Sequence, residues 1–103
     1  MNITGNKFVA DFGMAKAILH IHTETSLTFT ILERNGNEED ISEMVKTQMM
    51  ELRPNLYMIT WVEKSGKTIT QIHDYQNEII YSNWTLPGGE FINKKGTLKQ
   101  TDK

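Results

Sequence analysis

The sequence predicts an all-β fold, an antiparallel meander that curls into a small barrel or packs as a sandwich. In the second half of the chain, alternating apolar runs are separated by turn residues at Ser65-Gly66, Gln76-Asn77 and Pro87-Gly88-Gly89. These turns recur about every eleven residues, which is typical of strands joined by hairpins. A small barrel of such strands can enclose one ligand. No motif in the chain indicates a particular catalytic activity.

Length and composition restrict the class of protein. A chain of 103 residues suits one domain, 1–103, in which we expect the polar tail from Lys99 to Lys103 to fray. A formal charge of −2 gives no electrostatic reason to expect nucleic acid as a partner. Without cysteine, and with no apolar stretch of signal-peptide or membrane-span length, the sequence predicts a cytoplasmic protein with no membrane partner.

The first half of the chain contains three predicted strands, Lys7 to Phe12, Lys16 to Thr23 and Thr25 to Glu33, which are rich in β-branched and aromatic residues. Asn35-Gly36 then predicts a tight turn. Four more strands are predicted in the second half: Leu56 to Glu63, Thr68 to Tyr75, Glu78 to Thr85 and Glu90 to Leu98.

The segment from Glu38 to Leu52 is ambiguous between helix and strand. Its apolar residues fall at helical spacing, acidic residues precede them, and Arg53-Pro54 would end a helix. Met44 to Glu51 can equally pair as a strand before the turn at Pro54-Asn55. Because a seven-stranded sheet would leave edges exposed, we favour an eighth strand here.

Several short motifs resemble the MoaF-like family of small calycin (lipocalin-like) barrels. They are an opening pattern at Phe8, Phe12 and Gly13, the run from Arg53 to Glu63, Gly66-Lys67-Thr68, His73-Asp74-Tyr75, Tyr81-Ser82-Asn83, and Gly89-Glu90-Phe91 through Gly96-Thr97-Leu98. The resemblance implies an eight-stranded antiparallel meander closed into a barrel, with the ambiguous segment as a strand. It implies little about chemistry, because no settled catalytic motif of the family can be carried over.

Hairpin geometry sorts the side chains onto two faces of the sheet. If each turn of the second half holds two residues, one face collects Tyr57, Trp61, Glu63, Thr70, Asp74, Tyr81 and Asn83, together with several isoleucines. Neither face is plainly polar. A partly polar cavity inside, with a second subunit covering apolar patches outside, would explain this, so we expect a ligand-binding homodimer.

The seven residues of that face form the predicted ligand-binding set, on the interpretation that the face lines the barrel. Trp61 and Tyr81 would supply an apolar wall, and Asn83 and the two carboxylates would orient polar groups of a ligand. Alternatively, the polar residues lie near the barrel mouths and bind nothing. If one hairpin loop holds three residues instead of two, the faces exchange, and Gln71, His73, Ser82 and Trp84 line the pocket.

Two further patterns raise the question of catalysis or metal binding. Glu63 and Asp74 share the predicted face but are offset along it, so no catalytic pair is assigned. Arg53, Tyr57, Glu63 and Tyr81 superficially match the residue set of small barrel decarboxylases. His20 and His22 could chelate a metal with His73, but Ala17, Leu19 and Ile21 form the more core-like face of that strand, so we expect exposed histidines, no metal and no cofactor.

The sequence therefore predicts a barrel that holds a small, partly apolar molecule. A small lyase-type enzyme using the same cavity is the first alternative. A protein-protein interaction module with a filled barrel is the second.

Overall fold

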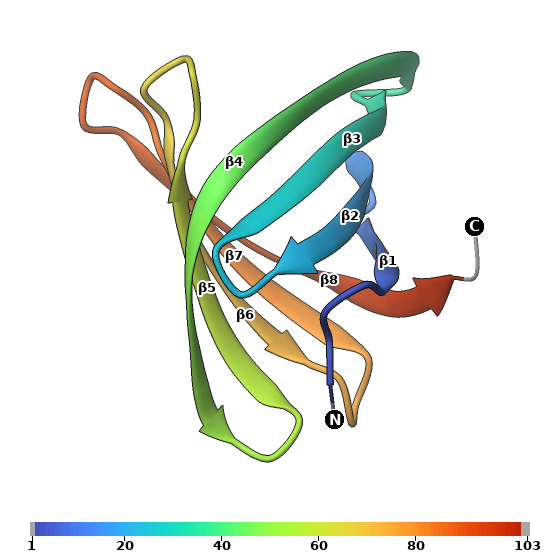
Figure 1. The fold of residues 1–103 in the computed structure, drawn as a ribbon. Helices are drawn as coiled ribbons and strands as arrows, with labels where there is room; N and C mark the ends of the chain where they lie inside the picture. The colour runs from blue at the N-terminus through green and yellow to red at the C-terminus, as the bar shows by residue number, and fades with distance from the viewer. Residues whose placement is uncertain (1, 102–103) are drawn as a thin grey trace.

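The structure of the protein is a computed structural model that describes residues 2–101. Within this range the chain forms eight strands and no helix. The strands are β1 (Lys7–Asp11), β2 (Ala15–Thr23), β3 (Ser26–Arg34), β4 (Asn37–Arg53), β5 (Leu56–Val62), β6 (Thr68–Asp74), β7 (Ile79–Thr85) and β8 (Phe91–Thr101). Each strand pairs antiparallel with the next, and β8 pairs with β1, so the sheet closes into a barrel (Figure 1). The predicted all-β barrel is confirmed.

A helix long and apolar enough to cross a membrane does not occur in residues 2–101.

The ambiguous segment is a strand, the long β4 that arches over one side of the barrel (Figure 1). Val45 lies opposite Leu27 of β3, and Thr47 lies opposite Trp61 of β5. Val45 is buried, whereas the preceding Met44 is 70% exposed. A helix would have placed Met44 and Val45 on one face, but pairing with two neighbouring strands imposes the two-residue period instead.

Two hairpin loops hold three residues where the sequence suggested two. Between β5 and β6, the Glu63 amide donates to the Lys67 carbonyl at 2.8 Å, and the Gly66 amide donates to the Glu63 carbonyl at 2.8 Å. The same pair of bonds joins Leu86, Gly89 and Glu90 between β7 and β8. The last residue of each loop is a glycine with positive φ, 92° at Gly66 and 95° at Gly89. This is the three-residue hairpin with a glycine bulge, so the prediction of two-residue turns here is wrong.

The extra loop residue changes which side chains of β6 and β7 face inward. Trp61 lies opposite Ile69, and Asn83 lies opposite Asn93. A shift of one residue moves every side chain of a strand to the other face. Inward-facing, buried positions on β6 and β7 are Ile69, Gln71, His73, Ile80 and Ser82.

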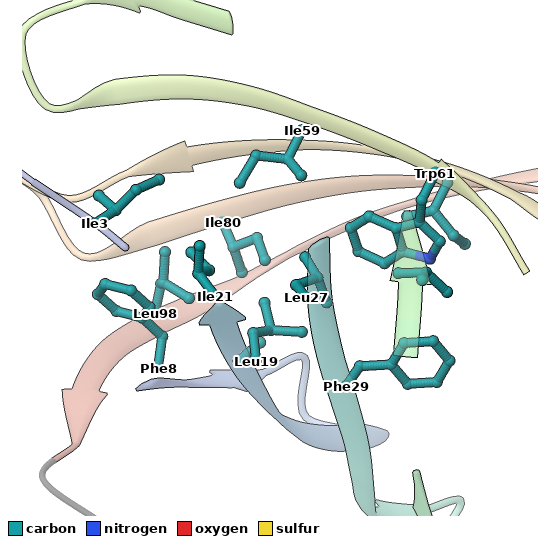
Figure 2. Packing of buried hydrophobic residues seen from close by; sticks show 13 residues of the cluster. Ile3, Phe8, Leu19, Ile21, Leu27, Phe29, Ile59, Trp61, Ile80 and Leu98 are labelled. Carbon is teal, nitrogen blue, oxygen red and sulfur yellow. The ribbon is translucent and has the colours of Figure 1, made fainter. Parts of the chain in front are cut away.

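The barrel is closed at one end and open at the other. Ile3, 4% exposed, packs at the closed end, where the Gly5 amide donates to the Ile21 carbonyl at 2.7 Å. Figure 2 shows Ile3 and Phe8 at one end of the buried cluster and Phe29 and Trp61 at the other. Fully buried Ile21, Ile59 and Ile80 belong to the same cluster. The open end is therefore where the barrel interior is accessible from solvent.

The seam between β1 and β8 depends on a glycine. A Cβ atom added to Gly96 would lie 2.3 Å from the backbone oxygen of Asp11. Beyond it, Lys99 and Thr101 pair with Val9 and Lys7. The prediction that the tail frays is therefore wrong for Lys99 to Thr101, and residues 102 and 103 lie outside the described range.

Candidate ligand-binding cavity

A cavity of about 220 Å³ opens at the unplugged end of the barrel. Its lining residues are Phe12, Met14, Ala15, Lys16, Ala17, Leu19, Phe29, Ile31, Arg34, Asn35, Trp61, Glu63, Lys67, Ile69, Gln71 and Trp84. For comparison, an apolar cavity of roughly 150 Å³ is enough to hold benzene. The cavity therefore has room for one ring with a small substituent.

Aromatic side chains provide much of the apolar wall. The rings of Phe29 and Trp61 lie nearly parallel, with centroids 6.2 Å apart and an interplanar angle of 22°. Phe12 and Trp84 meet edge to face, with centroids 5.6 Å apart. Such pairs hold each other in place, so the rings of the wall restrain one another.

One carboxylate lies against this wall at the rim. Trp61 Nε1 donates a hydrogen bond to Glu63 Oε2 at 3.3 Å, and Lys67 Nζ lies 3.8 Å from Glu63 Oε1. The Glu63 side chain is only 13% exposed. Burial raises the pKa of the Glu63 carboxyl, and the neighbouring Lys67 and the Trp61 hydrogen bond oppose part of that rise.

The other charged groups that line the cavity are cations. Arg34 Nε lies 3.3 Å from Glu39 Oε2. Lys16 Nζ lies 3.4 Å from Glu33 Oε2 and 3.9 Å from Asp11 Oδ2. All of these side chains are partly exposed to solvent at the rim.

A chain of buried polar groups runs from Gln71, in the lining, along the inner face of β6 to Tyr75. Gln71 Oε1 lies 2.7 Å from His73 Nε2, and Tyr75 Oη lies 2.8 Å from His73 Nδ1. Gln71 Nε2 donates to Ser82 Oγ at 3.3 Å. Since an amide oxygen only accepts, His73 carries its proton on Nε2 and donates to Gln71, while Tyr75 donates to Nδ1.

Burial keeps this chain uncharged. It lowers the pKa of His73 to about 3 and raises the pKa of the Tyr75 hydroxyl. The neutral chain fixes the orientation of the Gln71 amide, which is the buried polar group in the cavity lining.

The seven predicted ligand-binding residues do not come together. Trp61 and Glu63 line the cavity. Tyr57 lies toward the closed end, where its ring meets that of Tyr75 at 5.9 Å. Four predicted residues lie on the outer face: Thr70, Asp74, Tyr81 and Asn83.

The predicted interior position is wrong for those four residues, because the loop at Lys64 to Gly66 has one residue more than assumed. On the outer face, Asp74 accepts hydrogen bonds from the backbone and side-chain amides of Asn77 at 3.1 and 2.9 Å. Asn83 Nδ2 donates to Asn93 Oδ1 at 2.6 Å, and Tyr81 is 43% exposed.

Of the residues that the alternative register favoured, Gln71 and Trp84 line the cavity, and His73 and Ser82 are buried beside Gln71. The sequence reasoning missed the lining residues of β2 and β3, above all Phe29 and Arg34. The sequence pattern predicts no cross-strand register for the first half of the chain. The position of Arg34 next to the Asn35-Gly36 turn was the available signal, because it places that side chain at a strand end.

The residues that resembled a decarboxylase set are dispersed. Glu63 is at the open end, Arg53 ends β4 at the opposite end of the β4-β5 hairpin, and Tyr81 is outside. Glu63 and Asp74 are also separated, since Asp74 pairs with Leu56 at the far end of β5.

The three histidines do not converge on a metal site. His20 and His22 lie side by side on the outer face of β2, with ring centroids 4.2 Å apart, and His22 Nε2 lies 2.7 Å from Thr28 Oγ1. His73 is inside the barrel. The predicted core positions Leu19 and Ile21 are confirmed as buried. Residues 2–101 contain no cluster of three or more His, Asp or Glu side chains that could hold a metal ion.

Fold and site together define a closed eight-stranded barrel with a cavity of about 220 Å³ at its open end. The family model described as MoaF-like matches residues 4–99, and the chain belongs to this family. The fold is similar to a crystal structure from Burkholderia vietnamiensis, of a protein described provisionally as a beta-lactamase. The TM-score is 0.88 and the identity 17%, over 98% of this chain and 97% of that one. A comparison with curated proteins found no match.

Proposed function

We propose that this barrel binds a small, partly apolar molecule in the cavity at its open end. The observation that carries the proposal is the cavity of about 220 Å³ walled by Phe29, Trp61 and Trp84, with the Gln71 amide among its lining residues. An apolar pocket with a few convergent polar groups is the usual form of a small-molecule site. The same cavity argues against a barrel filled solid by side chains, and no observation favours the lyase alternative.

Intrinsic fluorescence offers a direct test. The chain has two tryptophans, and both line the cavity. We expect titration with single-ring compounds, beginning with benzamide and benzoate, to change tryptophan emission along a saturable curve. Trp61→Phe should weaken this response, and Phe91→Ala, which truncates an exposed outer aromatic, should leave it unchanged. If no single-ring probe produces saturation in a protein that is shown to be folded, the proposal is wrong.

A homodimer is the second part of the proposal, and the outer face of β4 to β8 supports it. Two neighbouring cross-strand rows on this face carry no charge from β4 to β7, although Lys95 of β8 continues the first of them beyond Tyr81. They consist of Met50, Met58, Ile72 and Tyr81, and of Gln48, Thr60, Thr70, Asn83 and Asn93. A second copy of the chain can meet a face with so few charges across a twofold axis with little like-charge repulsion.

Native mass spectrometry and sedimentation of the full chain test this interface. We expect a dimer that Ile72→Glu converts to a monomer and that His20→Glu, on the outer face of β2, does not disturb. A monomeric parent protein at tens of micromolar, or a dimer unaffected by Ile72→Glu, would contradict the proposed face.

A cytoplasmic location also remains part of the proposal, and fractionation of host cells tests it.

A further inference from the structure

We propose that the ligand of this cavity is a monoanion, a single ring or equivalent apolar group that carries a carboxylate or similar acid at the barrel mouth. This inference rests on the proposed function, since it names the chemical class that the same cavity would accept.

The charges that line the cavity are strongly biased. Three cations, Lys16, Arg34 and Lys67, and one carboxylate, Glu63, belong to the lining. The partners of Lys16 and Arg34, which are Asp11, Glu33 and Glu39, lie at the same end but outside the lining, so the excess of cations is confined to the residues that line the cavity. A ligand inside the cavity therefore meets more cations than carboxylates, which favours a ligand with a negative charge.

The cations can turn to a ligand at small cost. Their partners are carboxylates of the rim, and three of these, Asp11, Glu33 and Glu39, are not part of the lining. Ion pairs between partly exposed groups contribute only about 0 to 1 kcal/mol each. A ligand carboxylate at the mouth can therefore compete for Lys16. Glu39 Oε2 is buried and has no hydrogen-bond partner among residues 2–101, so Arg34 keeps that ion pair and offers its remaining N–H groups to the ligand.

Glu63 does not reverse this bias. Its Oε2 accepts the Trp61 N–H, its Oε1 faces Lys67 at 3.8 Å, and the side chain is mostly covered. Burial raises the pKa of this carboxyl, which disfavours its negatively charged form. Substitution by glutamine keeps an acceptor for Trp61 and removes the charge.

The apolar wall and the charged mouth suit the two ends of such a ligand. A ring can lie against Phe29 and Trp61, and the removal of its apolar surface from water lowers the free energy of binding. An acid group buried deeper would lose its hydration without a charged partner, which is costly. At the mouth it keeps water on one side and faces the partly exposed Arg34 and Lys67 on the other.

Three matched probes test the class: benzoate, benzamide and benzylammonium, which share one ring and differ in charge. At low salt and pH 7 we expect benzoate to bind about tenfold more tightly than benzamide, since two or three weak ion pairs together amount to roughly 1.4 kcal/mol. Benzylammonium should bind most weakly. In 1 M NaCl the preference for benzoate should shrink severalfold, because salt screens exposed charges.

Matched variants locate the effect. Arg34→Gln combined with Lys67→Gln should remove most of the preference for benzoate and leave benzamide binding within about twofold. Glu63→Gln should strengthen benzoate binding. Lys99→Gln, which removes an exposed lysine outside the cavity lining, is the control and should change neither ligand.

The possible failures are distinguishable. Equal affinities for benzoate and benzamide, or a preference for benzylammonium, would overturn the anion inference and leave the binding proposal standing. A benzoate preference that survives the double variant would also overturn the role assigned to these cations. Absence of saturable binding by all three probes would overturn the proposed function and this inference together.

Discussion

Trp61 and Glu63, two residues apart, are joined by a hydrogen bond of 3.3 Å from the indole Nε1 to the carboxylate Oε2. This bond ties the aromatic wall of the cavity to the carboxylate at its rim. Side chains two residues apart on a strand point to the same face of the sheet, so Trp61 and Glu63 both face the cavity. The bond also restrains Trp61, whose ring lies beside that of Phe29.

The buried position of Glu63 predicts that its charge destabilises the folded protein near neutral pH. The pKa of Glu63 is higher in the folded protein than the ordinary carboxyl value of the unfolded chain. Between these two pKa values the folded protein binds more protons than the unfolded chain, so its stability falls as the pH rises through that range. We expect Glu63→Gln to unfold at higher urea concentration than the parent protein at pH 7, and the difference to shrink at pH 4. Glu38→Gln, an exposed change on β4, is the control. A variant less stable than the parent at pH 7 would contradict this assignment.

The neutral state of His73 predicts the opposite dependence on pH. Its folded-state pKa is about 3, against an ordinary 6.5, so the unfolded chain takes up a proton below pH 6.5 and the folded protein does not. Stability is therefore full above pH 6.5 and is lost as the pH falls, by up to about 1.4 kcal/mol per pH unit. Urea unfolding at pH 7, 5.5 and 4.5 measures this slope.

His73→Gln should flatten that slope, although the variant will be less stable at pH 7 because the hydrogen bonds to Gln71 and Tyr75 change. His22→Gln, on the outer face, should retain the parent slope. An unchanged slope in His73→Gln would show that another group governs the response to acid.

The close approach at the β1-β8 seam predicts that Gly96 tolerates no side chain. An alanine Cβ would lie 2.3 Å from the Asp11 backbone oxygen, and backbone cannot move aside as a flexible side chain can. We expect Gly96→Ala to cost about 3 kcal/mol or more, or to prevent folding. Gly88→Ala is a matched control, since nothing lies within 4 Å of its added Cβ. Equal thermal midpoints for the two variants would show that the seam can relax.

Ile3 is expected to stabilise the barrel as the plug of its closed end. It is 4% exposed and belongs to the core cluster with Phe8 and Leu98. Ile3→Ala should lower the free energy of unfolding by about 2 to 5 kcal/mol, the usual cost of emptying a buried isoleucine site. Ile41→Ala, at a position 50% exposed on β4, should cost far less. Similar losses in both variants would mean that Ile3 contributes no more than a surface residue.

The strands themselves were predictable because their signals are local. Two-residue alternation and β-branched residues mark the strands, and Asn35-Gly36 forms a turn in which both residues have positive φ, 52° and 82°. The segment containing Val45 was harder, since its apolar spacing fits a helix as well. Pairing with β3 and β5 decides that case, and a pairing partner is not visible in the segment's own sequence.

The candidate site was only half predictable. Trp61 and Glu63 could be assigned because they follow one strand, but Thr70 and Tyr81 were assigned across hairpins whose loop length was assumed. Gly66, the third residue of the loop Lys64-Ser65-Gly66, was the signal for the longer loop, because three-residue loops of this kind end on a residue with positive φ.

The sequence by itself determined an all-β meander of the MoaF-like family, since alternation, turn residues and family motifs are properties of short segments. Only the tertiary structure decided which side chains face the cavity. One additional residue in a hairpin loop exchanges the inward-facing and outward-facing side chains of the strand that follows. Barrel closure fixes the register through hydrogen bonds between strands distant in sequence. The excess of cations in the cavity lining has the same origin, because Arg34 and Lys67 line one cavity only when the sheet closes.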